Sequence, residues 1–276
     1  YEKPTRRTRS VCMKAWMHGY SGRMGQEITK AIRATNHWTL VGGSSARGLM
    51  FEEQEGLSWD QFSNAVTNAD LVIDFSSVAG NLELQKVIRS DSHYSKALLI
   101  GSTGLDQKQI DEWQKLAKDK KVAILLAPNT SLGILLLHQV SKLLGEVLAP
   151  QGFDIEILES HHRAKLDAPS GTAKFLAQGI AGVLDKTIKV NRDGKRESNE
   201  IGVTALRGGT VFGEHEIQYL GDEEEIKISH RALSRGLFAK GAVLLGEWIV
   251  KQKPGFYRLE DITIEEMIKL IQERKV

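Results

Sequence analysis

The stretch HGYSGRMGQE, His18–Glu27, decides the fold expected for this chain. It follows a short apolar, strand-like segment, Val11–Met17, and it leads into a segment whose apolar residues recur at helical spacing. Three glycines, each three residues from the next, therefore lie at a strand-to-helix junction. Such a junction needs a tight turn, and the N-terminus of its helix offers free N–H groups to an anion.

The remainder of the first half repeats the alternation of strand and helix. Further strand-like runs are Trp38–Ser44, Leu71–Phe75, Ala97–Ile100 and Lys121–Ala127. Strands that alternate with helices predict right-handed crossovers and a mostly parallel sheet that is covered on both faces. This half is expected to form a Rossmann-like nucleotide-binding domain.

After Pro128 the pattern changes. A long apolar helix, a strand and a second helix are followed by three strand-like runs with no helix between them and then by two helices. In order, these segments are Ser131–Leu148, Phe153–Glu159, Ser170–Leu184, Ile201–Leu206, Glu214–Leu220, Glu225–His230, Leu237–Lys251 and Ile264–Glu273. The pattern predicts an α+β domain with an open mixed sheet. The domains are expected at residues 11–129 plus 237–276 and at residues 130–236, with 1–10 as a flexible N-terminal segment.

Composition restricts the classes of partner and compartment. The 276 residues include 37 Lys and Arg against 35 Asp and Glu, and the net charge of +2 gives no footprint for nucleic acid or an anionic membrane. Apolar runs such as Ile134–Leu137 are far shorter than a bilayer-spanning helix. The single cysteine, Cys12, indicates a reducing compartment, and we expect a cytoplasmic protein. The basic opening YEKPTRRTRS lacks the apolar core of a signal peptide. A trimmed or engineered end, or the remnant of a transit peptide to an organelle stroma, is expected instead.

The glycine turn favours a dinucleotide, although a glycine-rich turn without a ligand is the alternative. NAD-binding folds usually place an acidic residue about 20 residues after the glycines. That neighbourhood here reads VGGSSARG and holds no carboxylate, whereas Ser44, Ser45 and Arg47 suit a 2′-phosphate and favour NADP. The strand ends GSTG (Gly101–Gly104) and APNTS (Ala127–Ser131) would complete a crevice at the carboxyl edge of the sheet.

The segment ESHHRAKLDAPSGTA, Glu159–Ala173, gathers titratable groups beside a helix start. A metal site on Glu159, His161 and Asp167 is disfavoured because adjacent strand histidines point apart and no further ligand has a usual zinc spacing. A nucleophilic Ser170 is disfavoured because the G-x-S-x-G elbow is missing and an N-cap explains the serine. The remaining alternatives are a polar loop, or proton donors His161 and Lys165 beside a helix start that binds a substrate carboxylate.

At this point the sequence resembles the 4-hydroxy-tetrahydrodipicolinate reductase (dihydrodipicolinate reductase) family. The family signature E-x-H-H-x-x-K-x-D-A-P-S-G-T-A is present without a gap at Glu159–Ala173. The pattern G-x-x-G-R-M-G matches Gly19–Gly25, G-T-T-G corresponds to GSTG, and A-N-F-S corresponds to PNTS at Pro128–Ser131. The resemblance extends from about Val11 to the final helices.

The resemblance implies NADPH-dependent reduction of 4-hydroxy-tetrahydrodipicolinate in the diaminopimelate route to lysine, by a homotetramer without a catalytic metal. NADH would be a weaker substitute, and closure at hinges near Pro128 and Arg235–Gly236 would bring the reactants together. His161 and Lys165 take the catalytic positions, and the substrate-binding positions are His162, Ser170, Gly171 and Thr172. The cofactor positions are Gly19, Tyr20, Ser21, Gly22, Arg23, Met24, Arg47, Gly101, Ser102, Thr103, Pro128, Asn129, Thr130 and Ser131.

Two departures from the family pattern affect the cofactor site. Ala46 stands where members that use both cofactors carry an acid, and Thr130 stands where an aromatic residue is usual beside the nicotinamide. Two other functions remain open from sequence. One is an NADP-linked reductase of another small dicarboxylate, and the other is a non-catalytic NADP-binding redox regulator.

Overall fold

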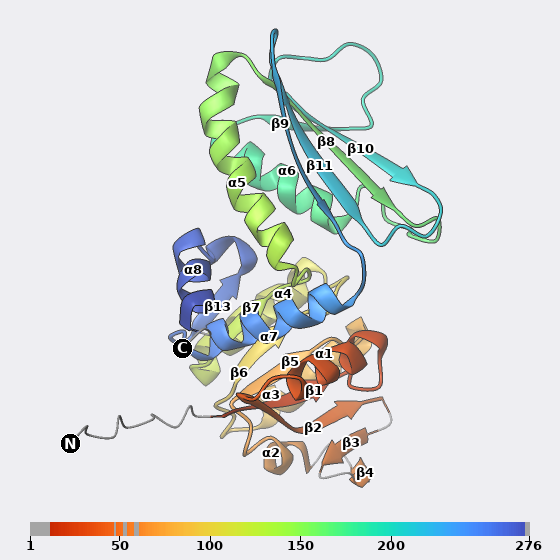
Figure 1. Cartoon of the computed structure of the whole chain (residues 1–276). Helices are drawn as coiled ribbons and strands as arrows, with labels where there is room; N and C mark the ends of the chain where they lie inside the picture. The colour runs from red at the N-terminus through yellow and green to blue at the C-terminus, as the bar shows by residue number, and fades with distance from the viewer. Residues whose placement is uncertain (1–11, 47, 52–53, 58–60, 274–276) are drawn as a thin grey trace, which may run out of the picture. The chain divides into compact units, whose positions relative to one another are not determined.

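The computed structural model describes residues 12–46, 48–51, 54–57 and 61–273, and the chain forms two compact units (Figure 1). The first unit comprises Tyr1–Pro128 with Ala242–Arg258, and the second comprises Asn129–Gly241 with Leu259–Val276. The chain passes from the second unit to the first within helix α7 (Gly236–Val250). The functional division expected from the sequence, 11–129 plus 237–276 against 130–236, stays a prediction.

The first unit is built on an eight-stranded sheet in the order β13-β7-β6-β5-β1-β2-β3-β4. Its strands are β1 (Met13–His18), β2 (Trp38–Ser45), β3 (Gly48–Phe51), β4 (Gln54–Leu57), β5 (Leu71–Asp74), β6 (Ala97–Ile100), β7 (Ala123–Leu126) and β13 (Gly255–Arg258). Its helices are α1 (Arg23–Arg33), α2 (Phe62–Ala65), α3 (Val78–Ser90) and α4 (Gln107–Lys120). All pairs from β13 to β2 are parallel, so the predicted Rossmann-like α/β fold is confirmed.

Strand β1 is the point from which the sheet extends in both directions, because it pairs with β2 on one side and β5 on the other. In open α/β sheets, ligands bind outside the carboxyl ends of the strands at such a switch point. Strands β5 and β7 are buried along their whole length, as a parallel sheet covered on both faces requires. The core around them includes Trp16, Phe62 and Trp113.

The second unit contains a five-stranded mixed sheet in the order β12-β11-β8-β10-β9. Its strands are β8 (Asp154–His161), β9 (Thr187–Val190), β10 (Glu200–Arg207), β11 (Glu214–Leu220) and β12 (Glu225–Arg231). Strand β8 pairs in parallel with β10 and antiparallel with β11. Helices α5 (Leu132–Leu148) and α6 (Gly171–Leu184) pack against this sheet (Figure 1), while α8 (Ile264–Glu273) follows the last strand of the first unit.

Alternating residues of β8 divide this sheet into two faces. Ile155 and Ile157 are fully buried in the core beneath α5 and α6, and they pair with Tyr219 and Ile217 on β11. The intervening residues, Glu156 among them, are only partly buried. The open mixed sheet that the sequence predicted is therefore confirmed, with one apolar and one more polar face.

Helix α5 and the following turn η2 (Ala149–Gln151) are longer than the uninterrupted apolar runs suggested. Together, as Leu132–Gln151, they are the one described segment long and apolar enough to cross a membrane by length and composition. Ile134 and Leu137 of this segment belong to the core of the second unit. Core helices commonly meet the same two criteria, and one such helix is weak evidence for a membrane span.

Several short elements escaped prediction. The hairpin β3–β4 extends the first sheet with antiparallel pairs, and β13 adds a parallel strand beside β7. Strand β9 borders β10 in the second sheet, where its four residues are exposed. Unlike the equally short β5, β6 and β7, these strands are not marked by an apolar run, and pairing with a neighbouring strand makes them strands.

Candidate active site

The glycine turn at the carboxyl end of β1 is shaped for close backbone approach. Gly19 has φ +86°, and a Cβ there would lie 2.7 Å from the carbonyl oxygen of Phe75. A Cβ on Gly25 would collide with the carbonyl oxygen of Gly19, so α1 is held tightly against the turn. A side chain at either position would push the turn and the helix start apart.

The N-terminus of α1 is open to an anion. Its N-cap is Gly22, for which no side-chain hydrogen bond is found among the described residues. In contrast, α3, α4, α5 and α6 are capped by the side chains of Ser77, Asp106, Ser131 and Ser170. The unpartnered N–H groups of a first turn bind phosphate well, so this turn fits a dinucleotide pyrophosphate. Of the predicted contacts, Ser21, Gly22 and Arg23 are exposed and Tyr20 and Met24 are partly buried.

The turn Gly101–Thr103 lies against Phe75, which follows β5. A Cβ on Gly101 would collide with the Phe75 ring, so the residue must be small. Thr103 is exposed, whereas Ser102 is buried and its hydroxyl donates to Asp74 Oδ2 at 2.7 Å. The side chain of Ser102 therefore holds the turn. Phe75 was missed because an aromatic residue at a strand end usually indicates core packing.

A buried carboxylate, Asp74, ties the strand ends together beneath this edge. Oδ1 accepts from the backbone N–H and hydroxyl of Ser76, at 3.0 and 2.6 Å, and Oδ2 accepts from Asn81 Nδ2 at 2.7 Å. With Ser102, four donors satisfy a group that is 0% exposed. The network fixes the ends of β5 and β6 relative to the start of α3. Sequence reasoning did not single out Asp74.

The structure changes the set of residues that the sequence analysis assigned to a 2′-phosphate. Ser44 is fully buried, and its hydroxyl accepts from Trp16 Nε1 at 3.0 Å and lies 2.7 Å from His18 Nδ1. Its hydroxyl is therefore engaged in packing and not turned to a ligand, contrary to the sequence interpretation. Ser45 is also buried, and Arg47 lies outside the described residues.

The segment Pro128–Ser131 is mostly tied to its own unit. Thr130 is 1% exposed, and its hydroxyl donates to the Phe238 carbonyl at 2.7 Å. Asn129 Nδ2 donates to Thr172 Oγ1 at 2.9 Å, and Ser131 caps α5 by accepting from the Ile134 N–H. Thr130 thus serves packing at the position where an aromatic residue was expected, and the structure brings Asn129 and Thr172 together.

The histidine segment forms a cluster around the carboxylate of Glu159 on β8. Glu159 is 1% exposed, and its Oε2 lies 2.5 Å from His161 Nδ1. Its Oε1 accepts from the Ser170 backbone N–H at 2.9 Å. Both Nη atoms of Arg207 donate to this carboxylate at 2.8 Å, one to each oxygen. The pairing is bidentate, the strongest geometry available to an arginine and a carboxylate.

Strand register brings two residues to this cluster that the sequence analysis missed. Arg207 on β10 lies opposite His161, and His215 on β11 lies opposite Glu159. The rings of His161 and His215 are 5.2 Å apart and nearly perpendicular, and His215 Nε2 lies 3.3 Å from the Ser170 hydroxyl. Both residues were far from the motif in sequence, and only register places them on the same face.

Burial and charge act against each other in this cluster. Burial lowers the pKa of His161, and the neighbouring cations Lys165 and Arg207 lower it further, although Glu159 opposes them. Burial would raise the pKa of Glu159, but hydrogen bonds from Arg207, Ser170 and His161 lower it overall. For His215, burial dominates and lowers the pKa to about 3, so its ring is neutral. His161 is the group whose charge can change within this site.

Lys165 and the start of α6 form the second part of the cluster. Lys165 Nζ pairs with Asp167 Oδ1 at 2.7 Å. Burial would raise the pKa of Asp167, but Lys165 and the backbone N–H of Gly171 lower it. A Cβ on Gly171 would meet no atom within 4 Å, so packing does not demand a glycine. Ser170 is committed as the N-cap, since its hydroxyl accepts from the Ala173 N–H at 3.1 Å. His162 is partly buried, and its N–H donates to the Val211 carbonyl.

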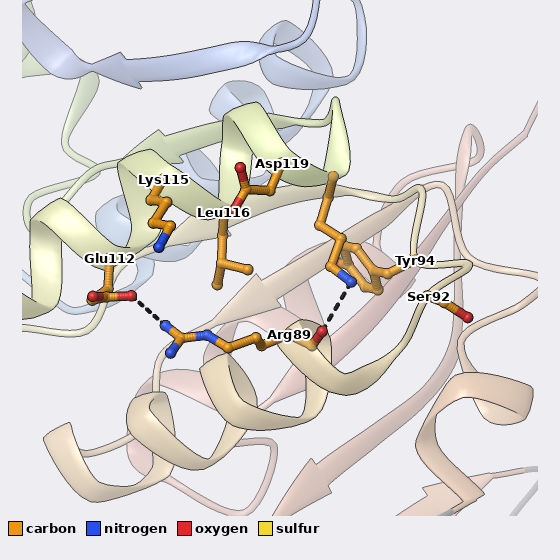
Figure 2. Close-up of a pocket in the computed structure, with 8 residues that line it drawn as sticks. Arg89, Ser92, Tyr94, Glu112, Lys115, Leu116 and Asp119 are labelled. Atoms are coloured by element: carbon orange, nitrogen blue, oxygen red, sulfur yellow. Dashed lines mark hydrogen bonds and ion pairs between the residues drawn. The ribbon is translucent and has the colours of Figure 1, made fainter.

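The first unit has a cavity that is separate from the predicted site residues. It measures 310 Å³ and is lined by residues of α3, α4 and the turn after α3 (Figure 2). Arg89 pairs with Glu112 across it at 2.5 Å, and Lys120 donates to the Arg89 carbonyl at 3.0 Å. None of the predicted site residues lines it. Within the described residues, no group of three or more His, Cys, Asp or Glu residues is arranged to bind a metal ion.

Two models from one family of reductases together match most of the chain. A family model for the N-terminus of dihydrodipicolinate reductase matches residues 13–130, and one for its C-terminus matches residues 133–263. The 4-hydroxy-tetrahydrodipicolinate reductase of Syntrophobacter fumaroxidans is 38% identical over 91% of this chain and 98% of its own. That of Aquifex aeolicus is 37% identical over 88% of this chain and 96% of its own.

Solved structures agree on the fold. A dipicolinate-bound dihydrodipicolinate reductase from Paenisporosarcina sp. TG-14 superposes with a TM-score of 0.71 at 24% identity, over 91% of this chain and 99% of its own. The diaminopimelate dehydrogenase of C. glutamicum, in complex with DAP, gives a TM-score of 0.57 at 13% identity, over 96% of this chain and 100% of its own. The likeness to these two structures is one of fold.

Proposed function

This chain belongs to the dihydrodipicolinate reductase family, and on that premise we propose the roles of its residues in the reaction. The protein is a 4-hydroxy-tetrahydrodipicolinate reductase, an NAD(P)H-dependent oxidoreductase of the diaminopimelate route to lysine. The bound dinucleotide supplies the hydride, and the protein must bind the dicarboxylate, stabilise the charge that develops on the ring nitrogen and supply a proton.

His161 and Lys165 carry the proton transfer and the charge stabilisation. The observation that carries this assignment is the position of His161 at the end of β8, with Nδ1 on Glu159. Lys165 is close enough for its charge to lower the pKa of His161. A negative substrate reverses that balance, because each carboxylate favours the protonated form of the imidazole and of the lysine.

One substrate carboxylate binds at Lys165 and the first turn of α6. The carboxylate of Asp167 already pairs with Lys165 and the Gly171 N–H, which supports the view that an anion is favourable there. In this proposal Gly171 and Thr172 supply the contacts, His162 adds a further one, and Ser170 supports the turn as the helix cap. Since packing leaves space at Gly171, the glycine serves the ligand and not the fold.

Inhibitors test this carboxylate site. Pyridine-2,6-dicarboxylate should compete with substrate, and pyridine-2-carboxylate should bind about ten- to a hundredfold more weakly, the value of one charge-assisted contact. Gly171→Val should remove this difference and leave NADPH affinity and the unfolding temperature unchanged. Equal inhibition of the native enzyme by both acids would leave Gly171 and Thr172 with only a capping role.

The first unit holds the dinucleotide, and NADPH is preferred to NADH. Support comes from the open N-terminus of α1, the glycines packed against Phe75 and the absence of a carboxylate from the sequence VGGSSARG. Arg47→Ala should raise KM for NADPH about ten- to a hundredfold and leave KM for NADH unchanged. A similar loss with both cofactors would contradict the 2′-phosphate assignment.

The active protein is a cytoplasmic homotetramer that assembles through the second unit. Support comes from the five-stranded sheet, whose helices pack on one face while the other face carries partly buried residues such as Glu156 and Leu158. Light scattering after gel filtration should give four times the chain mass. A monomer that retains full activity would contradict this assembly.

The direct test of the activity follows NADPH absorbance while the preceding enzyme of the pathway generates substrate in the cuvette. His161→Gln and Lys165→Ala should each lower kcat by about 10²–10⁴ and preserve NADPH binding. If the native protein binds NADPH but shows no turnover, the alternative function as a non-catalytic NADP-binding redox regulator is favoured.

A further inference from the structure

We propose that Glu159 and Arg207 are positioning residues that act on the reduction through His161. Glu159 fixes the imidazole tautomer, so that Nε2 is the nitrogen that exchanges a proton with the substrate. Arg207 balances the charge of Glu159, so that this nitrogen can both gain and release the proton. The inference rests on the proposed role of His161 as a proton donor.

The tautomer follows from the contacts of Glu159. The bidentate contact with Arg207 and the N–H of Ser170 keep this carboxylate ionised, so it can only accept hydrogen bonds. The nitrogen 2.5 Å from it, His161 Nδ1, must therefore carry a hydrogen. Nε2 is then the nitrogen available for chemistry.

The surroundings of Nε2 agree with this assignment. Among the described residues, the hydrogen bond found for the His161 ring is that of Nδ1, and Nε2 is not one of the fully buried nitrogens without a partner. A Cβ placed on Gly213 would lie 2.9 Å from Nε2, so the glycine before β11 leaves this nitrogen accessible. A side chain at this position would crowd the nitrogen that has to meet the substrate.

Arg207 prevents Glu159 from fixing the charge of the ring. A buried carboxylate alone with an imidazole holds the imidazole in its protonated form, which makes a poor proton donor. Arg207 places a permanent positive charge on the same carboxylate, from the strand position opposite His161. Glu159 and Arg207 together are neutral, so the ring can alternate between its neutral and cationic forms.

The other groups that face His161 come from three further elements. Lys165 lies on the loop after β8 and contributes a second positive charge, which Asp167 partly balances. His215 on β11 packs edge-on against the ring and is neutral. Ser170, the cap of α6, contacts Glu159 through its N–H. Unlike these groups, Arg207 makes a bidentate contact with the carboxylate that holds Nδ1.

The proton balance of the step is simple. Reduction adds one hydride from the dinucleotide and one proton to the substrate. The Nε2–H bond of the imidazolium breaks, the proton passes to the substrate, and His161 is left neutral with its Nδ1 hydrogen on Glu159. Solvent restores the Nε2 proton before the next turnover.

Imidazole NMR tests the inference independently of turnover. The ¹⁵N shifts of His161 should show a hydrogen on Nδ1 in the native protein. In Arg207→Gln, the protonated fraction of His161 on the alkaline side of its titration should rise about tenfold, the usual effect of removing one nearby cation. Arg207→Lys keeps the charge and should titrate like the native protein. Arg192→Gln, which removes an arginine paired with Glu156 on the other face of β8, is the matched control.

The pH dependence of kcat then separates the inference from the function on which it rests. If, in Arg207→Gln, the alkaline limb of kcat moves to higher pH together with the NMR titration, the positioning role of Arg207 and the role of His161 as proton donor both stand. A shifted titration with an unshifted limb supports the role of Arg207 but rejects His161 as the proton donor. An unshifted titration in Arg207→Gln, or a native tautomer with hydrogen on Nε2 only, overturns the inference whatever the rate.

Discussion

Replacement of Glu159 by glutamine tests the centre of the active-site cluster with the smallest change of shape. The carboxylate accepts four hydrogen bonds, two from Arg207 and one each from His161 and Ser170. The amide of glutamine offers one oxygen and one NH₂ group. The oxygen can still accept from Ser170, but the NH₂ group then meets donors. We expect His161 to turn to the other tautomer, with Nδ1 accepting from the amide and the hydrogen on Nε2.

The cost in stability can be worked from the same contacts. Removal of one partner from a buried ion pair destabilises a protein by about 3–5 kcal/mol, because the other charge is left uncompensated. Arg207 keeps 17% of its side chain exposed and can turn partly toward solvent. We therefore expect a loss of about 2–4 kcal/mol in the free energy of unfolding. The kinetic loss should be about 10²–10⁴ in kcat, since a ring whose Nδ1 accepts from the amide stays neutral, and its Nε2–H is a far weaker acid than that of an imidazolium.

The assay combines urea unfolding at a fixed protein concentration with steady-state kinetics. Glu156→Gln is the matched control, because Glu156 lies on the opposite face of β8 and pairs with Arg192 and Arg196. This control should lose stability but keep kcat, and NADPH affinity should be unchanged in both variants. A Glu159→Gln enzyme with native kcat would refute the positioning role, and native stability would refute the calculation of its cost.

Three further predictions concern other parts of the chain. Gly101→Ala should weaken NADPH binding about tenfold, because the new Cβ forces the Phe75 ring to move. Gly208→Ala, where a Cβ meets open space, is the control and should leave NADPH binding unchanged. Fluorescence titration with NADPH compares the two variants. Because the pKa of Glu159 is lowered in the folded state, its contribution to stability is present above the unfolded pKa of about 4.3 and is lost as the pH falls through the folded value. The unfolding midpoint of the native protein should therefore drop more steeply in acid than that of Glu159→Gln. Gly182→Ala, on an exposed position of α6 with no atom within 4 Å of the new Cβ, should raise the free energy of unfolding by about 0.5–1 kcal/mol, measured by thermal melting.

The order of strands and helices could be predicted because local patterns encode it. β6, β11 and α8 have the bounds that apolar spacing indicated, and α6 begins after its serine cap as expected. The fold class followed from the change at Pro128, where alternation of strand and helix stops. The hairpin β3–β4 and the edge strand β9 could not be predicted, since pairing with a neighbouring strand, and not their own sequence, makes them strands.

The candidate site was predictable only where its residues are close in sequence. Glu159, His161 and Lys165 belong to one motif, and alternation along a strand places the first two on one face. Arg207 and His215 come from other strands, and a shift of one residue in either pairing would turn them to the opposite face. Ser44 was misinterpreted for a related reason, because a hydroxyl at a strand end can serve a ligand or, as here, the indole of Trp16.

The position of the charged cluster in its sheet indicates that it serves the reaction and not the core. Along β8, the buried face changes from Ile155 and Ile157 to Glu159 and His161, so charge replaces the hydrophobic core at the end where α6 begins. Buried ion pairs seldom add stability over apolar residues of similar size, because desolvation offsets their attraction. An isoleucine at position 159 would continue the core at lower cost. A carboxylate at position 159 is explained if it controls the proton on the imidazole of His161. Arg207, the cation paired with that carboxylate, is explained if this proton has to leave the imidazole during the reaction.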